Sequence, residues 1–406
     1  MTQSNITRRG MLGAAAAGAS VLAMPTVLRA QPSEYIIGAS LPLTGPFATA
    51  GKLIAPAFSL YQAMINAEGG INGVNIKIVT EDSGYVATNA LANYQRLLAS
   101  EGKNVVAYYG DSTGFMKLVG PELKGDQARM MTSTSFATEL ANPETHPYQF
   151  MSGPTYADQF DILLQDIAAK GGKTVAFIHS NNEFGTDPLE HGKKRAAELG
   201  IDVVLVEATK TQGADIPTHV TKLAQANPDY CILQGYVTGV WPQLIGGARQ
   251  FGLATKFMGT FWGMEKLIAD RVTAEAGPFL DGYQGVMPYR YSYDQEDAPR
   301  LQQIAEMSKT MFAGTPLENY MPTWGLQAFA SLELLTIALK RNADAGLEMS
   351  NADNIAAALA TVKDVDLGGY YGKNVSIENN KVGIGRVYQY SAESRLFTPT
   401  SDWLTV

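Results

Sequence analysis

The chain has 406 residues, of which 46% are hydrophobic, and its formal net charge is −8. A chain of this length can bury a large core and usually divides it between two domains. The acidic balance and the lack of a basic cluster disfavour nucleic acid and anionic membranes as partners. Cys231 is the single cysteine, so an intrachain disulfide is excluded and the fold must depend on packing.

The N-terminus has the layout of an export signal. Paired arginines in residues 7–12 (TRRGML) precede an apolar stretch at 11–24, and a cleavage site is expected at 28–30. The stretch is too short and too rich in Ala and Gly for a membrane anchor. The arginine motif resembles the twin-arginine pattern, whose pathway exports folded proteins. We therefore predict residues 1–30 as a twin-arginine-type signal peptide and the mature protein as soluble and periplasmic.

From Tyr35 onward, short β-rich apolar runs alternate with segments of helical periodicity. The first block predicts strands at 35–43, 75–82, 104–110 and 128–135, with helices at 54–68, 90–100 and 115–123. The second block begins with a helix at 159–172 and predicts strands at 173–180, 202–210, 229–236 and 255–261, with helices at 188–200, 216–227 and 241–252. Such alternation is typical of parallel sheets covered by helices on both faces. We therefore predict an α/β fold with two sheets.

The last third of the chain has a different pattern. Two long helices are expected at 297–312 and 324–342, after the Tyr-rich stretch 285–293. The tail from Gly368 is rich in Gly and Tyr and predicts short β-structure. These segments must pack on the two sheets already predicted, because they do not repeat the strand–helix rhythm themselves.

Three strand ends of the first block carry Gly, Ser or Thr. They are residues 42–47 (PLTGPF), 110–114 (GDSTG) and 133–138 (STSFAT). Open parallel sheets bind ligands beyond the carboxyl ends of their strands, so we expect the three corners to converge on one site. Amides and hydroxyls at a helix start favour an anion by about 0.3–1 kcal/mol, rising to about 2 kcal/mol when partly buried. The alternative is that Ser112 or Thr113 only caps its helix.

Motifs for catalysis are missing from the sequence. There is no HExxH, no Cys/His cluster, no GxSxG and no GxxxxGK[ST]. Of the four histidines, His146, His191 and His219 lie in polar or Pro-flanked segments, and His179 ends a predicted strand where it could face the site. We therefore predict a binding protein that is not an enzyme, with no cofactor and no metal.

Five segments carry a resemblance to a known family. They are IIGASLPLTGPFATAG (36–51), EGGINGVNIKIVTEDSG (68–84), AFIHSNNEFGTDPLEHGKKRAAELG (176–200), ADIPTHVTKLAQANPDY (214–230) and ATKFMGTFWG (254–263). In this order they resemble the type I periplasmic solute-binding proteins of the branched-chain amino acid (Leu/Ile/Val) ABC-transporter family. The resemblance implies two Rossmann-like lobes with parallel sheets, joined by a three-stranded hinge, that close on a small ligand.

The resemblance also implies where the lobes begin and end. The three crossovers of the hinge fit residues 151–154, 287–291 and 365–369. The implied lobes are residues 31–152 plus 292–365 for lobe 1 and residues 153–291 plus 366–406 for lobe 2. The implied partners are a small-molecule carboxylate ligand and an inner-membrane ABC permease. We expect no nucleic acid, no direct membrane insertion and a monomer.

Site residues follow from the family's pattern by position. The ligand carboxylate of family members meets a hydroxyl and helix-start amides after the third strand, and groups on the loop after the next strand. The corresponding residues here are Ser112, Thr113, Ser135 and Ala137. Five aromatic residues are expected to face the same cleft, with core packing as the alternative for each: Phe47, Phe184, Tyr236, Phe261 and Trp262. Phe184 stands where the family has a pocket tyrosine.

The expected ligand depends on a missing acid. Family members that bind amino acids commonly place an acid directly after the strand ending in FMG, where it holds the α-ammonium. Here that stretch is residues 259–262 (GTFW), and the first acid is Glu265. A buried ammonium without a partner is costly. An aromatic cleft with a carboxylate clamp suits a flat aromatic acid of benzoate or hydroxycinnamate type.

Asp111 leaves two interpretations open. Either its carboxylate points into a hydrogen-bond network, or it holds an ammonium and the ligand is a branched-chain or aromatic amino acid. A further alternative is a ligand-sensing receptor for a signalling partner.

Overall fold

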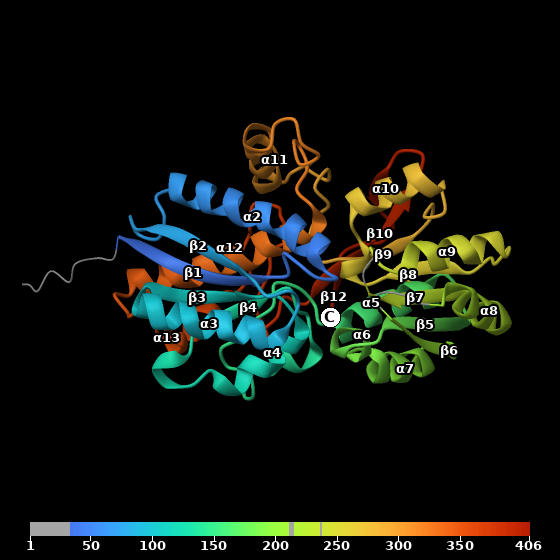
Figure 1. The fold of residues 1–406 in the computed structure, drawn as a ribbon, viewed down its shortest axis with the longest axis horizontal. Coiled ribbons are helices and arrows are strands. Elements are labelled where there is room, and N and C mark those ends of the chain that lie inside the picture. The colour runs from blue at the N-terminus through green and yellow to red at the C-terminus, as the bar shows by residue number, and fades with distance from the viewer. Residues whose placement is uncertain (1–32, 211–214, 236–237) are drawn as a thin grey trace, which may run out of the picture. The chain divides into compact units, whose positions relative to one another are not determined.

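The computed structural model describes residues 33–210, 215–235 and 238–406. Figure 1 shows the arrangement of its strands and helices. The predicted signal peptide, residues 1–30, lies outside the described residues. The residues from Glu34 to Val406 form one compact unit, which contains two β-sheets.

The first sheet is made of four parallel strands. They are β1 (Glu34–Leu41), β2 (Asn75–Asp82), β3 (Val105–Gly110) and β4 (Met130–Ser133), in the order β2-β1-β3-β4. The helices between them are α2 (Ala48–Ala67), α3 (Ala87–Glu101) and α4 (Thr113–Val119). Every residue of β3 is buried, as expected for a parallel strand that helices cover on both faces. The first predicted sheet is thus confirmed.

The second sheet has eight strands and mixed direction. They are β5 (Thr174–Ser180), β6 (Asp202–Thr209), β7 (Tyr230–Gln234), β8 (Lys256–Gly259), β9 (Gln284–Met287), β10 (Ile384–Ser391), β11 (Leu396–Pro399) and β12 (Leu404–Thr405). Their order is β11-β10-β9-β8-β7-β5-β6, and β12 pairs with β10. The strands from β5 to β9 are parallel, whereas β10 runs antiparallel to β9 and β11. The predicted β-structure of the tail is therefore present.

The helices of the second block are α5 (Tyr156–Ala169), α6 (Glu183–Thr186), α7 (Leu189–Glu198), α8 (Ile216–Ala226), α9 (Trp241–Gln250) and α10 (Lys266–Ala276). After β9 the chain forms α11 (Pro299–Met311), α12 (Thr323–Asp344) and α13 (Ala352–Ala360). The sequence did not predict α6, α10, β9 or α13. The elements α6 and β9 have four residues each, and tertiary contacts select such short segments over the other conformations open to them.

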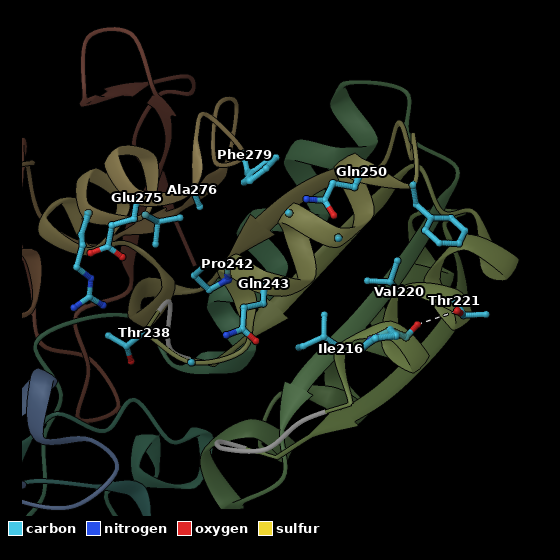
Figure 2. Close-up of a pocket in the computed structure, with 17 residues that line it drawn as sticks. Ile216, Val220, Thr221, Thr238, Pro242, Gln243, Gln250, Glu275, Ala276 and Phe279 are labelled. Carbon is cyan, nitrogen blue, oxygen red and sulfur yellow. Dashed lines mark hydrogen bonds between the residues drawn. The ribbon is translucent and has the colours of Figure 1, made fainter.

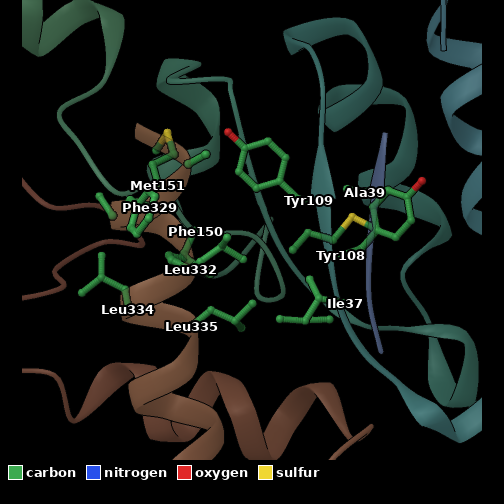
Figure 3. Close-up of a cluster of buried hydrophobic side chains, with 14 of the residues drawn as sticks. Ile37, Ala39, Tyr108, Tyr109, Phe150, Met151, Phe329, Leu332, Leu334 and Leu335 are labelled. Atoms are coloured by element: carbon green, nitrogen blue, oxygen red, sulfur yellow. The ribbon is translucent and has the colours of Figure 1, made fainter. Parts of the chain in front are cut away.

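Helix α12 is buried along most of its length and packs on the first sheet. It contacts α2, α13 and β4. Figure 3 shows Phe329, Leu332 and Leu335 of α12 in the core that they share with Ile37 and Tyr109 of the sheet. Residues after β9 thus return to the first sheet, and β10 then joins the second. The lobe boundaries given above stay a prediction.

The predicted helices and strands differ from the observed ones mainly at their ends. Helix α2 begins at Ala48 rather than at residue 54, because its first turn packs on the preceding corner. A Cβ on Gly51 would lie 2.3 Å from the Pro42 carbonyl oxygen, so only glycine allows this approach. Helix α4 begins at Thr113 because Ser112 caps it, and after Val119 it tightens into a 3₁₀ turn.

We predict that Leu332→Ala lowers the free energy of unfolding by about 2–5 kcal/mol, because it leaves a cavity in the core under α12. Leu347→Ala, at a side chain that is 48% exposed just beyond the same helix, is the matched control and should change stability by less than about 0.5 kcal/mol. Urea unfolding followed by circular dichroism measures both. Equal unfolding midpoints for the two variants would contradict the packing of Leu332 in the core under α12.

Candidate functional site

Side-chain hydrogen bonds join the carboxyl ends of β1, β2 and β3. Asp82 ends β2, and its carboxylate accepts the N–H groups of Leu43 at 2.8 Å and Thr44 at 3.2 Å, and the Thr44 hydroxyl at 2.6 Å. These bonds lower the pKa of Asp82, the Thr44 hydroxyl first among them. The next residue, Ser83, donates its hydroxyl to Asp111 at the end of β3. Two of the three predicted corners are thereby tied together through the β2 end.

A second pair of hydroxyls joins the ends of β3 and β4. Thr113 Oγ1 lies 2.9 Å from Ser135 Oγ, which also accepts the N–H of Ala137 at 3.1 Å. All three residues are buried. The structure therefore brings together the predicted residues of two different corners, as expected from the common edge of a parallel sheet.

Ser112 serves as the cap of α4. Its Oγ accepts the N–H of Phe115 at 3.2 Å and donates to Asp111 Oδ1 at 2.9 Å. Its hydroxyl proton is therefore engaged within the protein. The helix-cap alternative describes the observed contacts of Ser112, and a contact with ligand stays a prediction.

Asp111 points into a hydrogen-bond network. Its carboxylate is buried and accepts the hydroxyls of Ser83 and Ser112. Burial raises its pKa, and these two hydroxyl bonds act in the opposite direction. The first of the two interpretations of Asp111 therefore agrees with its contacts.

Two buried glutamines, which the sequence analysis missed, position the aromatic residues of the second sheet. Gln234 ends β7, donates to the Phe184 carbonyl at 2.9 Å and accepts the Thr260 hydroxyl at 2.6 Å. Gln159 of α5 accepts the N–H of Phe261 at 2.9 Å and donates to the Pro154 carbonyl at 3.0 Å. Gln159 could have been found from the sequence, because it lies in the predicted helix 159–172 at a position that the apolar pattern places on the buried side.

The predicted aromatic residues of the second sheet belong to one cluster of rings. The ring of Phe136, which follows β4, lies 5.6 Å from that of Phe261, and Phe261 lies 5.3 Å from Trp262, both in edge-to-face geometry. Tyr156 is 5.1 Å from Phe184 and 6.0 Å from Phe136. The cluster thus joins rings from both sheets. Phe136 and Tyr156 were not predicted as site residues.

The other two predicted aromatics have different outcomes. Phe47 is buried at the start of α2, where its ring lies 4.1 Å from that of Tyr85. Tyr236 lies outside the described residues. Trp324, at the start of α12, joins the cluster through Trp262 at 5.6 Å and was likewise missed.

Glu265 is the first acid after β8, three residues beyond the stretch GTFW (259–262). It is fully buried, and its carboxylate accepts the N–H of Leu267 at 3.1 Å, the Tyr320 hydroxyl at 3.0 Å and the N–H of Thr323 at 2.8 Å. Leu267 lies at the start of α10 and Thr323 at the start of α12, so one carboxylate caps two helices. Burial raises the pKa of Glu265 to about 7, against the effect of these donors.

A second acid also caps a helical turn. Asp187 accepts the N–H of Thr138 at 3.1 Å and its hydroxyl at 2.5 Å, and burial raises the Asp187 pKa. His179 is buried with Nδ1 3.0 Å from the Ser180 carbonyl oxygen, and burial lowers its pKa. Within the described ranges no cluster of His, Cys, Asp or Glu could hold a metal ion.

A separate groove of about 760 Å³ lies among α8, α9 and α10 (Figure 2). Val220, Gly246 and Phe279 contribute apolar surface, and Arg271 and Glu275 contribute charges. None of the predicted site residues that the structure describes lines this groove.

In the part of the chain that the structure describes, no helix is both long and apolar enough to span a membrane.

Known proteins with the same architecture were found at the level of family, sequence and structure. A model of the periplasmic binding protein family matches residues 34–395. The leucine-, isoleucine-, valine-, threonine-, and alanine-binding protein of Pseudomonas aeruginosa is 24% identical over 262 residues, which cover 63% of this chain and 67% of that protein.

Two solved structures share the fold. The branched-chain amino acid ABC transporter protein from Thermus thermophilus with bound valine has a TM-score of 0.80 and 19% identity, and the alignment covers 92% of this chain and 97% of that one. The solute-binding protein from Rhodopseudomonas palustris BisB5 in complex with 3,4-dihydroxybenzoic acid has a TM-score of 0.70 and 19% identity, with 88% and 93% covered.

The two sheets, with helices on their faces and the crossing of the chain between them, define a type I periplasmic binding protein fold. The chain belongs to the periplasmic binding protein family, a family of solute-binding proteins of ABC transporters. The resemblance to the Leu/Ile/Val group is confirmed by the curated relatives.

We predict that Glu265 makes stability depend on pH. Its folded-state pKa of about 7 lies above the ordinary value of 4.5, so its stabilising contribution is complete below about pH 4.5 and is lost as pH rises through 7. The free energy of unfolding of the wild type should therefore fall by roughly 2–4 kcal/mol more than that of Glu265→Gln over this window.

The measurement is urea unfolding of both proteins at several pH values between 4.5 and 8. The slope with pH is compared rather than absolute stability, because the Gln amide cannot accept the Thr323 N–H through its nitrogen. Glu393→Gln, at an exposed acid, is the control and should keep the wild-type slope. Parallel curves for wild type and Glu265→Gln would show that Glu265 does not titrate in this range.

Proposed function

We propose that this protein is the periplasmic substrate-binding component of an ABC importer and that it binds a small aromatic carboxylate of benzoate or hydroxycinnamate type. The observation that carries the proposal is the junction of two features at the end of β4. Phe136, whose ring contacts Phe261, lies in the chain between Ser135 and Ala137, which belong to the hydroxyl corner. A flat ring and its carboxylate would meet arenes on one side and hydroxyl donors on the other.

In our proposal the hydroxyl pair supplies a donor to the ligand. A hydroxyl has one proton and two lone pairs. If Thr113 donates to Ser135, the Ser135 proton remains to bind a carboxylate oxygen, while the Ala137 N–H already occupies a Ser135 lone pair. The start of α4 adds the favourable potential of helix N–H groups for an anion.

The nearby acids support a ligand without an ammonium group. Asp111 accepts two serine hydroxyls, and Glu265 accepts three donors at two helix starts. Moving either carboxylate to an ammonium would leave its buried donors unpaired, at about 1–3 kcal/mol each. The structural neighbour from Rhodopseudomonas palustris is in complex with 3,4-dihydroxybenzoic acid, so a protein of this fold can bind an aromatic acid.

A branched-chain amino acid is the second candidate ligand. The Pseudomonas aeruginosa relative is named for leucine, isoleucine, valine, threonine and alanine, and the Thermus thermophilus neighbour has bound valine. These are properties of those proteins, whose sequences are at most 24% identical to this one. An amino-acid ligand would need an acid other than the engaged carboxylates of Asp111 and Glu265.

We further propose that the two sheets are the cores of two lobes, residues 31–152 plus 292–365 and residues 153–291 plus 366–406, that close on the ligand. The packing of α12 on α2 and the pairing of β10 with β9 support this division. The partner is an inner-membrane permease, the protein acts as a monomer without catalysis, and residues 1–30 direct it to the periplasm through the twin-arginine pathway.

Thermal unfolding in the presence of candidate ligands tests the ligand class. The protein is freed of bound molecules by unfolding and refolding, and then heated with 4-hydroxybenzoate, 4-hydroxycinnamate, leucine or valine. A ligand at 100 times its dissociation constant stabilises the folded state by about 2.7 kcal/mol, so the two aromatic acids should raise the melting temperature. A rise with leucine or valine alone would replace the aromatic acid by an amino acid.

A variant tests the carboxylate grip. We expect Ser135→Ala to weaken 4-hydroxybenzoate binding by about 1.5–3 kcal/mol, the range for a hydrogen bond to a charged group. The neutral analogue 4-hydroxybenzamide is the control ligand, and its affinity should change much less. Isothermal titration calorimetry measures both. Equal losses for acid and amide would mean that Ser135 does not hold the charged group.

A further inference from the structure

We propose that Gln327 is a positioning residue of the ligand site, because it fixes the ends of β3 and β4 against the place where the chain crosses between the two sheets. Gln327 lies in α12, is fully buried and belongs to none of the predicted site residues. The inference rests on the proposed function, because a positioning residue presupposes a ligand site. Gln327 itself need not contact the ligand.

On one side, the amide of Gln327 bridges two strand ends. Its Nε2 donates to the Ser133 carbonyl at the end of β4, and its Oε1 accepts the hydroxyl of Tyr109 near the end of β3. Figure 3 shows the Tyr109 ring reaching from β3 toward α12. Ser133 Oγ in turn accepts the N–H of Ser135 at 3.0 Å. One planar amide thus bridges the ends of the two paired strands that lead to the Thr113–Ser135 hydroxyl pair.

Gln327 is also linked by hydrogen bonds, through Ser331, to the first place where the chain crosses between the sheets, at residues 151–154. Its Nε2 lies 3.2 Å from Ser331 Oγ, which lies 2.8 Å from Ser152 Oγ. Ser152 Oγ is also 2.8 Å from the Tyr289 hydroxyl, and the Ser152 carbonyl accepts the Tyr371 hydroxyl at 2.7 Å. Ser152 and Tyr289 lie in two of the three predicted crossovers, and Tyr371 follows the third closely.

The network also reaches the aromatic side of the site. The Tyr289 ring lies 5.8 Å from the Phe261 ring, in edge-to-face geometry. A hydrogen-bonded path therefore runs from the corner that carries Ser135, through Gln327 and Ser152, to a ring that contacts Phe261. Its members are buried, so each missing partner would leave an unpaired polar group in a region of low dielectric constant.

Only an amide satisfies this place in full. The Tyr109 hydroxyl needs an acceptor, and the Ser133 carbonyl needs a donor at the opposite end of the same planar group. Methionine is similar in volume but supplies neither. An ionised glutamate would place a negative charge against the Ser133 carbonyl, whereas a protonated glutamate restores one donor and one acceptor.

The first test uses ligand-free protein and compares Gln327→Met with Thr336→Val. Thr336 lies in the same helix, is buried and accepts the Tyr61 hydroxyl at 2.7 Å, so its loss also removes a buried hydrogen bond. Hydrogen exchange is measured for residues 133–138. We expect exchange there to become at least tenfold faster in Gln327→Met and to stay within twofold of wild type in Thr336→Val. Equal rates in the two variants would overturn the proposal.

The second test measures the dissociation constant of 4-hydroxybenzoate, or of leucine if the wild type binds only leucine. Gln327→Met should bind at least tenfold more weakly than wild type, and Thr336→Val within twofold. Glu is the conservative replacement: at pH 5.5 a buried carboxyl is largely protonated, so Gln327→Glu should bind more tightly than Gln327→Met there. Variants of Gln327 that bind as wild type does, or no gain with Glu, would overturn the positioning role.

The two tests separate the inference from the proposed function. A wild type that binds none of the probes would contradict the proposed ligand classes, and the exchange comparison would still decide whether Gln327 holds the strand ends. A wild type that binds a probe while the exchange of residues 133–138 ignores Gln327→Met would contradict the inference alone.

Discussion

The parallel pairing of β3 between β1 and β4 is the constraint on which the rest of the structure depends. Parallel strands must all end at the same edge, and each needs a crossover that covers a face of the sheet. The parallel pairing alone therefore places the ends of the four strands side by side. Polar groups that are buried at this edge must pair with one another. Asp111 pairs with Ser83 and Ser112, and Thr113 pairs with Ser135.

The burial of polar groups also bears on the proposed ligand. The Glu265 carboxylate accepts three donors at two helix starts, and it would have to give up some of these bonds to hold a ligand ammonium. The Thr113–Ser135 pair differs, because a hydroxyl can donate a hydrogen bond as well as accept one. The proposed preference for an acid therefore rests on which groups are engaged and which are available, and not on the fold.

The family relationship and the buried network describe different levels of this protein. The family gives the architecture, which solved neighbours with different bound molecules share. The contacts of Gln327, Ser152 and Tyr289 depend on the particular side chains of this chain, which join the hydroxyl corner at the end of β4 to the ring cluster. Contacts alone do not show that the hydroxyl corner and the ring cluster are energetically coupled. Hydrogen exchange of the ligand-free protein and ligand affinity must both be measured to establish this coupling.

By itself the sequence determined the α/β class, the two blocks of parallel strands, the strand ends with hydroxyl corners and the family. The class, the blocks of strands and the corners follow from local periodicity and turn residues, which act over a few residues. The family followed from the resemblance of five segments of the sequence. Tertiary structure alone decided that Ser112 caps α4 and donates to Asp111, that Phe136 and Tyr156 join the rings, and that Gln327 bridges two strands. Each of these contacts depends on partners distant in the sequence or on the exact direction of a side chain, and a local pattern contains neither.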